Sequence, residues 1–454
     1  MTRTLLWLLL AALPSLAASG SALAADKIGS EVYARLRTVP RVTVVVALKE
    51  STPAHDAAQR DARTQRIAAS ADAVLAALPD GSYTLRRRFE HVAALSMDVS
   101  TKAVDALRRQ AEVARVDLDV GGGAQMLEAA PLAHVSNVRA RGLVGMGVKT
   151  AVIDSGARLN HPDLADSIVG QQCFCSSATP GTGCCPNGSD TQSGAGAAAD
   201  GNGHGTNVTG IITGNGTQSP LGGAPAASTV VVRMLDDQGR FNSSADIVAA
   251  LDWIASHHPD TKVVNLSLGT DQLFAGNCDT STAWTIALAQ AAAAVAANGT
   301  LMTVSSGNQA SPTSIAAPAC LSNVLAVGAV WDSTMPNQNF LGCVDTGIVA
   351  DRPTCFTNSS VNVALYAPGA YTVSTGLAGA TSSYGGTSQA APLVAACIAD
   401  LFQFKPTLTR ERVKSALIAS PTRVVDPKNS LSFPRLDCEQ ALIDIDRIFA
   451  DGLE

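Results

Sequence analysis

The fold class is decided by residues 148–156, which read VKTAVIDSG. This stretch is a short, largely apolar run rich in β-branched residues, and it ends in Asp154 followed by a serine and a glycine. Runs of this kind, bounded by turn residues, are typical of strands buried on both faces of a parallel sheet. Similar runs follow at 229–235, 263–268, 301–305 and 324–330. Because segments with helical periodicity separate them, we predict an α/β domain whose parallel sheet carries helices on both faces.

Two of the separating segments carry clear helix signals. Ser243 and Asp246 have the spacing of a capping box, and the apolar residues after them recur at the spacing of one helix face. A second helix is predicted over 281–297, where an alanine-rich run ends at an Asn-Gly pair. The Gly/Ser-rich stretch 176–203 shows neither pattern, so we expect it to be a surface loop.

The start of the chain has the pattern of a secretory signal peptide. Residues 1–24 combine Arg3, a short apolar run and the small-residue triplet Ala22-Leu23-Ala24. The alternative is a membrane anchor, which needs roughly 20 apolar residues to cross a bilayer. Pro14 interrupts the run well before that length. We therefore expect a secreted protein without a membrane anchor, located outside the cell or in the periplasm.

Residues 25–125 show a different order of elements from the rest of the chain. The expected strands lie at 41–48, 84–100 and 113–120, and the expected helices at 56–78 and 102–110. This order predicts a small α+β domain that ends at the glycine triplet 121–123 and the flexible stretch behind it. The chain is thus divided into a signal peptide at 1–24, an α+β domain at 25–125 and the α/β domain at 126–454.

Composition and charge limit the partners. Apolar residues make up 46% of the chain and charged residues 15%, as in globular proteins with a sizeable core. The net charge of −6 is uneven, since residues 25–125 carry +2 and residues 126–454 carry −9. This difference favours docking of the small domain on the large one. No run of basic residues indicates a nucleic-acid partner, and we expect a monomer.

All ten cysteines lie between Cys173 and Cys438. An even number of cysteines in an exported chain predicts disulfides. The expected pairs are Cys278 with Cys320, Cys343 with Cys355, and Cys397 with Cys438. The remaining four, Cys173, Cys175, Cys184 and Cys185, have a zinc site as the alternative, although export favours disulfides here too.

Three stretches carry residues suited to covalent catalysis. Asp154 ends a predicted strand, so its carboxylate would emerge at the carboxyl edge of the sheet, although such a residue is commonly only a helix cap. His204 lies in DGNGHGT, where glycines let the backbone bring an imidazole, a suitable general base, into a crowded site. Ser388 lies in GGTSQAAP at the start of a helical run that continues over 393–402, where a serine is ordinarily a cap. Together they provide a nucleophile, a base and a group to orient that base.

In their order of Asp, His and Ser, these motifs resemble those of the subtilisin-like serine proteases. The resemblance implies a secreted endopeptidase in which Ser388 attacks the peptide bond, His204 is the general base and Asp154 orients it. It also implies that Asn308, in the segment SSGN, donates to the oxyanion together with the backbone N–H of Ser388. Ser306 and Gly307 of that segment, with Ser267, Leu268 and Gly269, are then expected to bind an extended peptide or protein substrate.

The family resemblance extends to the first domain, which is similar to the inhibitory propeptide of these enzymes. The chain would then be a zymogen, with residues 25–125 as folding assistant and intramolecular inhibitor, and it would cut itself between about residues 121 and 131. No cofactor is expected to be required. Calcium stabilises many relatives, but no oxygen-rich cluster in the sequence gives it a place.

Two positions depart from the family pattern. Asn207 stands where a second histidine is common, and Gln389 stands where methionine is usual after the nucleophile. We expect activity to be retained, with changes in packing or substrate preference. Two alternatives use the same scaffold. One is an acid peptidase of the sedolisin type with a glutamate base, and the other is a binding protein without catalysis.

Overall fold

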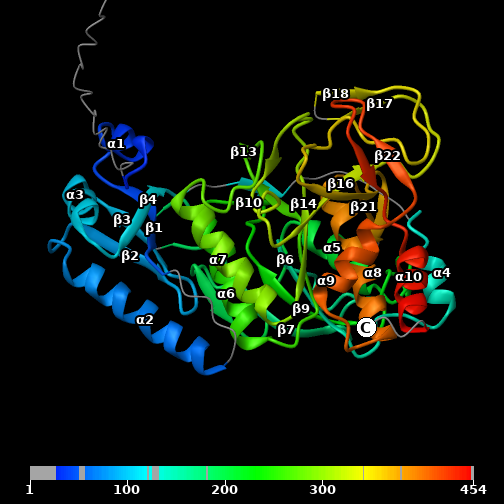
Figure 1. Cartoon of the computed structure of the whole chain (residues 1–454), viewed down its shortest axis with the longest axis horizontal. Helices are drawn as coiled ribbons and strands as arrows, with labels where there is room; N and C mark the ends of the chain where they lie inside the picture. Colours follow the sequence, from blue (N-terminus) through cyan, green and yellow to red (C-terminus); the bar gives the residue numbers. More distant parts are fainter. Residues whose placement is uncertain are drawn as a thin grey trace, which may run out of the picture.

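The computed structural model describes residues 27–50, 57–119, 122–124, 132–179, 182–340, 342–378 and 381–450. The predicted signal peptide lies outside the described residues, as does most of the predicted cleavage range. Figure 1 shows a smaller unit built from the beginning of the chain, which packs beside a larger unit built from the rest.

The larger unit is organised around one eight-stranded sheet. Its spatial order is β19(Val363–Pro368), β16(Leu325–Val330), β14(Leu301–Ser305), β11(Val263–Leu266), β6(Lys149–Asp154), β9(Ser228–Arg233), β7(Ile168–Phe174) and β8(Thr191–Ser193). Every neighbouring pair is parallel except β7 with β8. The parallel α/β prediction is therefore confirmed, and the predicted runs correspond to β6, β9, β11, β14 and β16. β7, β8 and β19 were not predicted.

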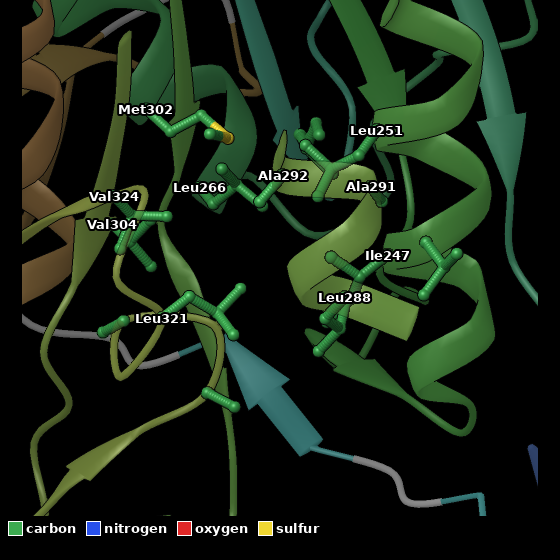
Figure 2. Packing of buried hydrophobic residues seen from close by; sticks show 14 of the residues in the cluster. Ile247, Leu251, Leu266, Leu288, Ala291, Ala292, Met302, Val304, Leu321 and Val324 are labelled. Atoms are coloured by element: carbon green, nitrogen blue, oxygen red, sulfur yellow. The ribbon is translucent and has the colours of Figure 1, made fainter. Parts of the chain in front are cut away.

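Helices cover both faces of this sheet, as expected. One face carries α6(Ser244–His257) and α7(Ala283–Ala297), and the other carries α5(His204–Thr213) and α8(Thr387–Phe404). In β14, Met302 and Val304 belong to the buried cluster of α6 and α7, whereas Leu301 belongs to that of α8. Figure 2 shows Met302 and Val304 in the cluster that α6 and α7 help to form. Successive strand residues point to opposite faces of the sheet. A strand with apolar residues at consecutive positions is therefore buried on both faces.

The start of α6 differs from the prediction. Its N-cap is Ser243, whose side chain accepts a hydrogen bond from the N–H of Ala245 at 3.2 Å. Asp246 does not complete a capping box, because its carboxylate accepts hydrogen bonds from Ser176 and from Arg87 of the smaller unit. The predicted capping box is therefore wrong, because the Asp246 carboxylate is engaged in tertiary hydrogen bonds instead. A capping box does open α7, between Thr282 and Thr285.

The smaller unit is a four-stranded antiparallel sheet with three helices. The sheet order is β2(Tyr83–Arg88), β3(Ala94–Val99), β1(Val42–Leu48) and β4(Val113–Leu118). The helices are α1(Ser30–Leu36), α2(Ala57–Ala76) and α3(Thr101–Arg109). The predicted strand over 84–100 is divided into β2 and β3, because the chain turns between them and buries Phe89 and Val92 against the larger unit.

The two units share a buried interface. Val45, Ala47 and Ala94 of the small sheet lie in the same apolar cluster as α6 and α7. Two carboxylates of the smaller unit also reach the N-termini of these helices, where backbone N–H groups lack partners within the helix. Asp117 accepts a hydrogen bond from the N–H of Ala283. Asp119 accepts hydrogen bonds from the side chain of Ser243, and from the N–H of Ser244 at 2.8 Å.

Five disulfides use all ten cysteines. The three expected pairs, Cys278–Cys320, Cys343–Cys355 and Cys397–Cys438, are confirmed. The other four cysteines form Cys173–Cys185 and Cys175–Cys184, so the zinc alternative is wrong for them. Both of these bonds close the loop that follows β7.

The remaining elements lie outside the two main sheets and the helices described above. The helices are α4(Val135–Ala140), α9(Arg410–Ile418) and α10(Cys438–Ala450). The strands are β5(Gly122–Ala124), β10(Arg240–Phe241), β12(Leu268–Thr270), β13(Leu273–Phe274), β15(Ile315–Ala316), β17(Gln338–Phe340), β18(Cys343–Asp345), β20(Thr372–Thr375), β21(Thr381–Tyr384), β22(Arg423–Val425) and β23(Ser432–Pro434). Among the described residues, no helix combines the length and the apolar character that spanning a membrane requires.

Candidate active site

Asp154 and His204 are in direct contact. Asp154 is the last residue of β6 at the carboxyl edge of the sheet, and His204 is the first residue of α5. His204 Nδ1 lies 2.8 Å from Asp154 Oδ1, and both side chains are fully buried. The same oxygen accepts the N–H of Ser155 at 2.7 Å. A buried carboxylate at Nδ1 fixes the ring orientation and leaves Nε2 for proton transfer.

The backbone around His204 is held by a neighbouring carboxylate. Asp200 accepts the N–H groups of Asn202 and Gly203 at 2.9 Å each, and that of Thr206 at 3.0 Å. Two glycines of this motif are required by the backbone geometry. Gly203 has a φ of 104°, and a Cβ at Gly205 would lie 2.2 Å from the carbonyl oxygen of Gly156. Only glycine lets the start of α5 approach the end of β6 this closely.

Tyr384 borders the imidazole from the end of β21. Its ring lies edge-on to that of His204, with centroids 5.9 Å apart. Burial raises the pKa of Tyr384, and the charges of Asp200 and Asp154 raise it further. The phenol therefore remains neutral, and its ring packs against the imidazole of His204. Tyr384 was not predicted, because no local sequence pattern distinguishes it from a packing residue.

Ser388 is the second residue of α8 and contacts Ser267 twice. Its Oγ donates to the carbonyl oxygen of Ser267 at 3.2 Å, and Ser267 Oγ donates to the carbonyl oxygen of Ser388 at 2.6 Å. Pro392, four residues later, has no N–H for that second carbonyl. Ser267 thus provides the hydrogen bond that the helix cannot. Asn265 donates to Ser267 Oγ at 2.9 Å and extends this buried polar chain.

Asn308 presents a buried N–H₂ group beside the start of α8. Its Oδ1 accepts the N–H of Thr387 at 3.0 Å and the Thr387 hydroxyl at 2.9 Å. These donors fix the orientation of the amide. Within the part of the chain that the structure describes, Asn308 Nδ2 is buried and has no hydrogen-bond partner. A buried donor without a partner next to Ser388 suits an oxygen that becomes negatively charged during a reaction.

The predicted substrate strand has a peptide segment beside it. β12, which contains Leu268 and Gly269, pairs antiparallel with β5, and β10 pairs with the other edge of β5. Gly123 is opposite Gly269 in this register, and Ala124 is opposite Leu268. The end of the smaller unit therefore lies in extended form between two strands of the larger one, as in β-augmentation.

The other predicted substrate residues have polar groups engaged by distant segments of the chain. Ser306 Oγ donates to the carbonyl oxygen of Asn358 at 2.9 Å. The N–H of Gly307 donates to Thr387 Oγ1 at 3.2 Å. Both residues thus stabilise the approach to Asn308, and this framework role was not predicted for them.

The two departures from the family pattern contact each other. Gln389 Nε2 lies 3.4 Å from Asn207 Oδ1, and Asn207 Nδ2 donates to Ser382 Oγ at 3.0 Å. These buried amides connect the helix that carries His204 with the helix that carries Ser388.

Among the residues that the structure describes, no three His, Cys, Asp or Glu side chains lie together as metal ligands would.

Comparisons with known proteins find similar sequences and a similar solved structure. Residues 145–433 match the subtilase family model, Peptidase S8. Subtilisin DY of Bacillus licheniformis is 31% identical over 297 residues, which cover 65% of this chain and 91% of that protein. An alkaline protease of Shouchella clausii is 31% identical over 355 residues, or 76% of this chain and 78% of that protein. The solved structure of a cold adapted subtilisin-like serine proteinase matches with a TM-score of 0.48 and 24% identity, covering 65% of this chain and 90% of that one.

The fold and the site thus define a hydrolase of the serine endopeptidase class. The chain belongs to the subtilase family. Membership favours the serine endopeptidase over both alternatives, the acid peptidase and the binding protein.

Proposed function

We propose that Ser388, His204 and Asp154 are the catalytic residues of this endopeptidase. Ser388 Oγ attacks the carbonyl carbon of the scissile peptide bond, and His204 takes its proton through Nε2. The imidazolium then gives this proton to the leaving amine, and Asp154 stabilises its charge. The observation that carries the proposal is the buried contact of 2.8 Å between His204 Nδ1 and Asp154 Oδ1.

The negative oxygen of the tetrahedral intermediate would be held by two donors. Asn308 Nδ2 is the first, supported by its burial without a partner among the described residues. The backbone N–H of Ser388 is the second. Water then hydrolyses the acyl-enzyme with His204 again as base. Since side chains and backbone supply every group, the reaction is proposed to need no cofactor. For structural calcium, which the family resemblance makes possible, we propose no position.

The chain is further proposed to be a secreted, monomeric zymogen that acts on peptides and proteins, with no nucleic-acid partner and no membrane anchor. Residues 25–125 would be its intramolecular inhibitor. The pairing of β5 with β12 supports this, because the inhibitor then occupies the substrate position. The pairing of Ala124 with Leu268 ends one residue before Ser267, whose carbonyl oxygen lies 3.2 Å from Ser388 Oγ. Self-cleavage is therefore proposed between Gln125 and Met126, residues that lie outside the described ranges.

The test compares the full chain with Ser388→Ala. The unaltered protein is expected to give a mature N-terminus at Met126 and to degrade an unfolded protein near neutral pH. The variant should retain residues 121–131 uncut and show no degradation. If both chains remain uncut and neither degrades the unfolded protein, the catalytic assignment is wrong. An activity maximum near pH 4 would instead support the acid-peptidase alternative.

A further inference from the structure

Three consecutive arginines in β2 have different surroundings. Arg86 pairs with Asp98 at 2.8 Å, and Arg88 pairs with Asp72 at 2.6 Å, both within the smaller unit. Arg87, which directly follows a register shift in the pairing of β2 with β3, instead crosses the interface to the larger unit. Its side chain is 8% exposed, and the carboxylate of Asp246 that it meets is fully buried.

The guanidinium of Arg87 is surrounded by acceptors. Its Nε donates to Asp246 Oδ1 at 3.0 Å, and Nη2 also contacts this carboxylate. The same Nη2 donates to the carbonyl oxygen of Asp190 at 3.1 Å and to Ser176 Oγ at 3.3 Å. Nη1 donates to Thr191 Oγ1 at 3.1 Å. The acceptors thus contact all three nitrogens of the guanidinium, which presents several N–H groups in fixed directions.

An aromatic ring completes the surroundings. The guanidinium carbon lies 5.4 Å from the centre of the Phe174 ring, within the range of a cation–π contact. Phe174 lies between Cys173 and Cys175 in the sequence and is opposite Thr191 in the pairing of β7 with β8. The guanidinium thus contacts an aromatic ring in addition to the acceptors.

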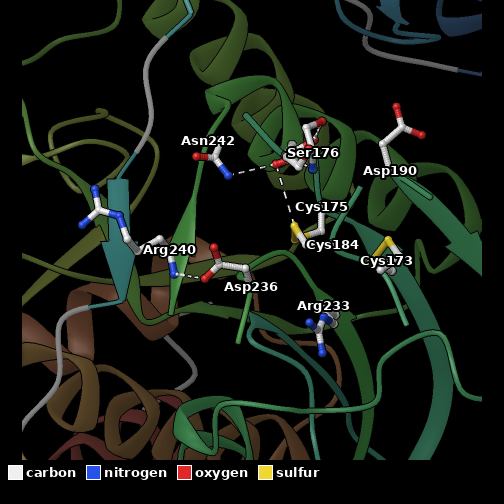
Figure 3. The surroundings of a disulfide bond; sticks show 12 residues. Cys173, Cys175, Ser176, Cys184, Asp190, Arg233, Asp236, Arg240 and Asn242 are labelled. Carbon is white, nitrogen blue, oxygen red and sulfur yellow. Dashed lines mark hydrogen bonds between the residues drawn. A yellow bond between two sulfur atoms is a disulfide. The ribbon is translucent and has the colours of Figure 1, made fainter. Parts of the chain in front are cut away.

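The two disulfides of this loop hold the acceptors in place. Cys173–Cys185 and Cys175–Cys184 flank Phe174, and Ser176 follows directly. Figure 3 shows Ser176 and Asp190 near the disulfides, with Asn242 donating to the carbonyl oxygen of Ser176 at 3.2 Å. The N–H of Ser176 donates to Asp246 Oδ2 at 2.8 Å. The acceptors are therefore positioned by the larger unit itself.

We propose that Phe174, Ser176, Asp190, Thr191 and Asp246 form a guanidinium-binding socket. Its occupant is Arg87, and its role is to retain the smaller unit on the enzyme after the chain between them is cut. The inference rests on the proposed function, which makes residues 25–125 a cleaved inhibitor. Removing one partner of a buried, hydrogen-bonded charge pair mainly accelerates dissociation, by about 30-fold or more. Lysine keeps the charge but lacks the planar fork, so it does not replace arginine.

The experiment measures how fast the smaller unit leaves the self-processed enzyme. Unaltered protein, Arg87→Ala, Arg87→Lys and Arg88→Ala are each allowed to process, and dilution starts the dissociation. Size-exclusion chromatography follows co-elution, and hydrolysis of a small chromogenic peptide follows activity. Both Arg87 variants are expected to release the smaller unit at least about 30-fold faster than unaltered protein. Arg88→Ala, which changes a pair within the smaller unit, is the matched control and should leave the release rate unchanged.

The outcomes distinguish the socket proposal from the proposed inhibitory role of residues 25–125, on which it rests. Equal release rates for Arg87→Ala and Arg88→Ala overturn the socket, and unaltered release in Arg87→Lys overturns its specificity for guanidinium. Full peptidase activity while the smaller unit still co-elutes overturns its inhibitory role alone, since co-elution continues to test the socket. If Arg87→Ala does not fold, the release rate is compared instead for Arg87→Lys, which changes the smaller unit, and for Thr191→Val, which changes the socket on the larger unit. Thr191→Val, which removes one acceptor, should accelerate release in the same direction but by less.

Discussion

The hydroxyl of Ser267 donates a hydrogen bond of 2.6 Å to the backbone carbonyl of Ser388, the carbonyl that Pro392 leaves without a partner in the helix. The proposed nucleophile is therefore held from the substrate-binding segment. Ser267 is fully buried, so no water replaces its hydroxyl without a change in packing. A residue proposed for substrate binding has a second role in positioning.

Ser267→Ala is expected to lower kcat by about tenfold with a smaller effect on KM. The reason is that a buried carbonyl left without a partner costs about 1–3 kcal/mol, and relaxation would shift Ser388 relative to His204. Steady-state kinetics on a small peptide substrate measure the effect. Ser267→Thr retains a hydroxyl and should recover much of the activity. A change in KM alone would assign Ser267 to substrate binding only.

Asn308→Asp is expected to lower kcat by about 100- to 1,000-fold, which is the range already established for the oxyanion asparagine of subtilisin itself. The aspartate still accepts the two hydrogen bonds from Thr387, but it offers no donor to the oxyanion. Comparison with Asn308→Ala separates loss of the donor from loss of the Thr387 contacts. Steady-state kinetics on a small peptide substrate measure both variants. A reduction in kcat of less than about threefold in both would contradict the role of Asn308.

Asp400→Asn is expected to stabilise the protein increasingly as pH rises. Burial raises the pKa of Asp400 to about 9, although the charge of Arg139 and the nearby backbone N–H of Gly145 oppose this. In the unfolded chain the pKa is about 4. The folded state therefore binds the extra proton, and its stability falls between about pH 4 and pH 9, by at most about 1.4 kcal/mol per pH unit.

Thermal unfolding at pH 5, 7 and 9 tests this, in the Ser388→Ala background to prevent self-digestion. The difference between Asp400→Asn and its parent should grow from pH 5 to pH 9. Asp446→Asn, an exposed carboxylate on α10, is the control and should show no such trend. A constant difference across this range would show that Asp400 does not titrate as inferred.

Asp119→Ala is expected to destabilise the uncut precursor by about 1–2 kcal/mol, since it removes the acceptor for the N–H of Ser244 at the start of α6. Urea unfolding of Ser388→Ala precursors with and without the substitution measures the loss. Asp80→Ala, an exposed change in the same unit, is the comparison. Equal midpoints for the two variants would mean that the carboxylate cap contributes nothing.

The sequence revealed those features that local chemistry dictates. Buried parallel strands read as apolar runs, so β6 and β14 were predictable. The catalytic candidates stood out because glycines or small residues surround them. Gly205 illustrates the reason, since only glycine fits against Gly156.

Contacts between distant segments were not predictable in this way. Asp246 looked like part of a capping box, but Arg87, which is 159 positions away, takes its carboxylate. The hydrogen bond between Ser267 and Ser388 spans 121 positions. One local signal for it existed, because Pro392 four residues after Ser388 indicates a carbonyl that needs an outside donor.

The placement of the disulfides has a consequence for the lifetime of the two units. All five cross-links lie in the larger unit, and the smaller unit has no cysteine. Part of its apolar surface is buried in the cluster that α6 and α7 help to form, at Val45, Ala47, Phe89, Val92 and Ala94, and small domains that lose such support are marginally stable. Once detached, it is expected to unfold and be digested by the enzyme it has left. Activation would then run in one direction only, with no inhibitor left to rebind.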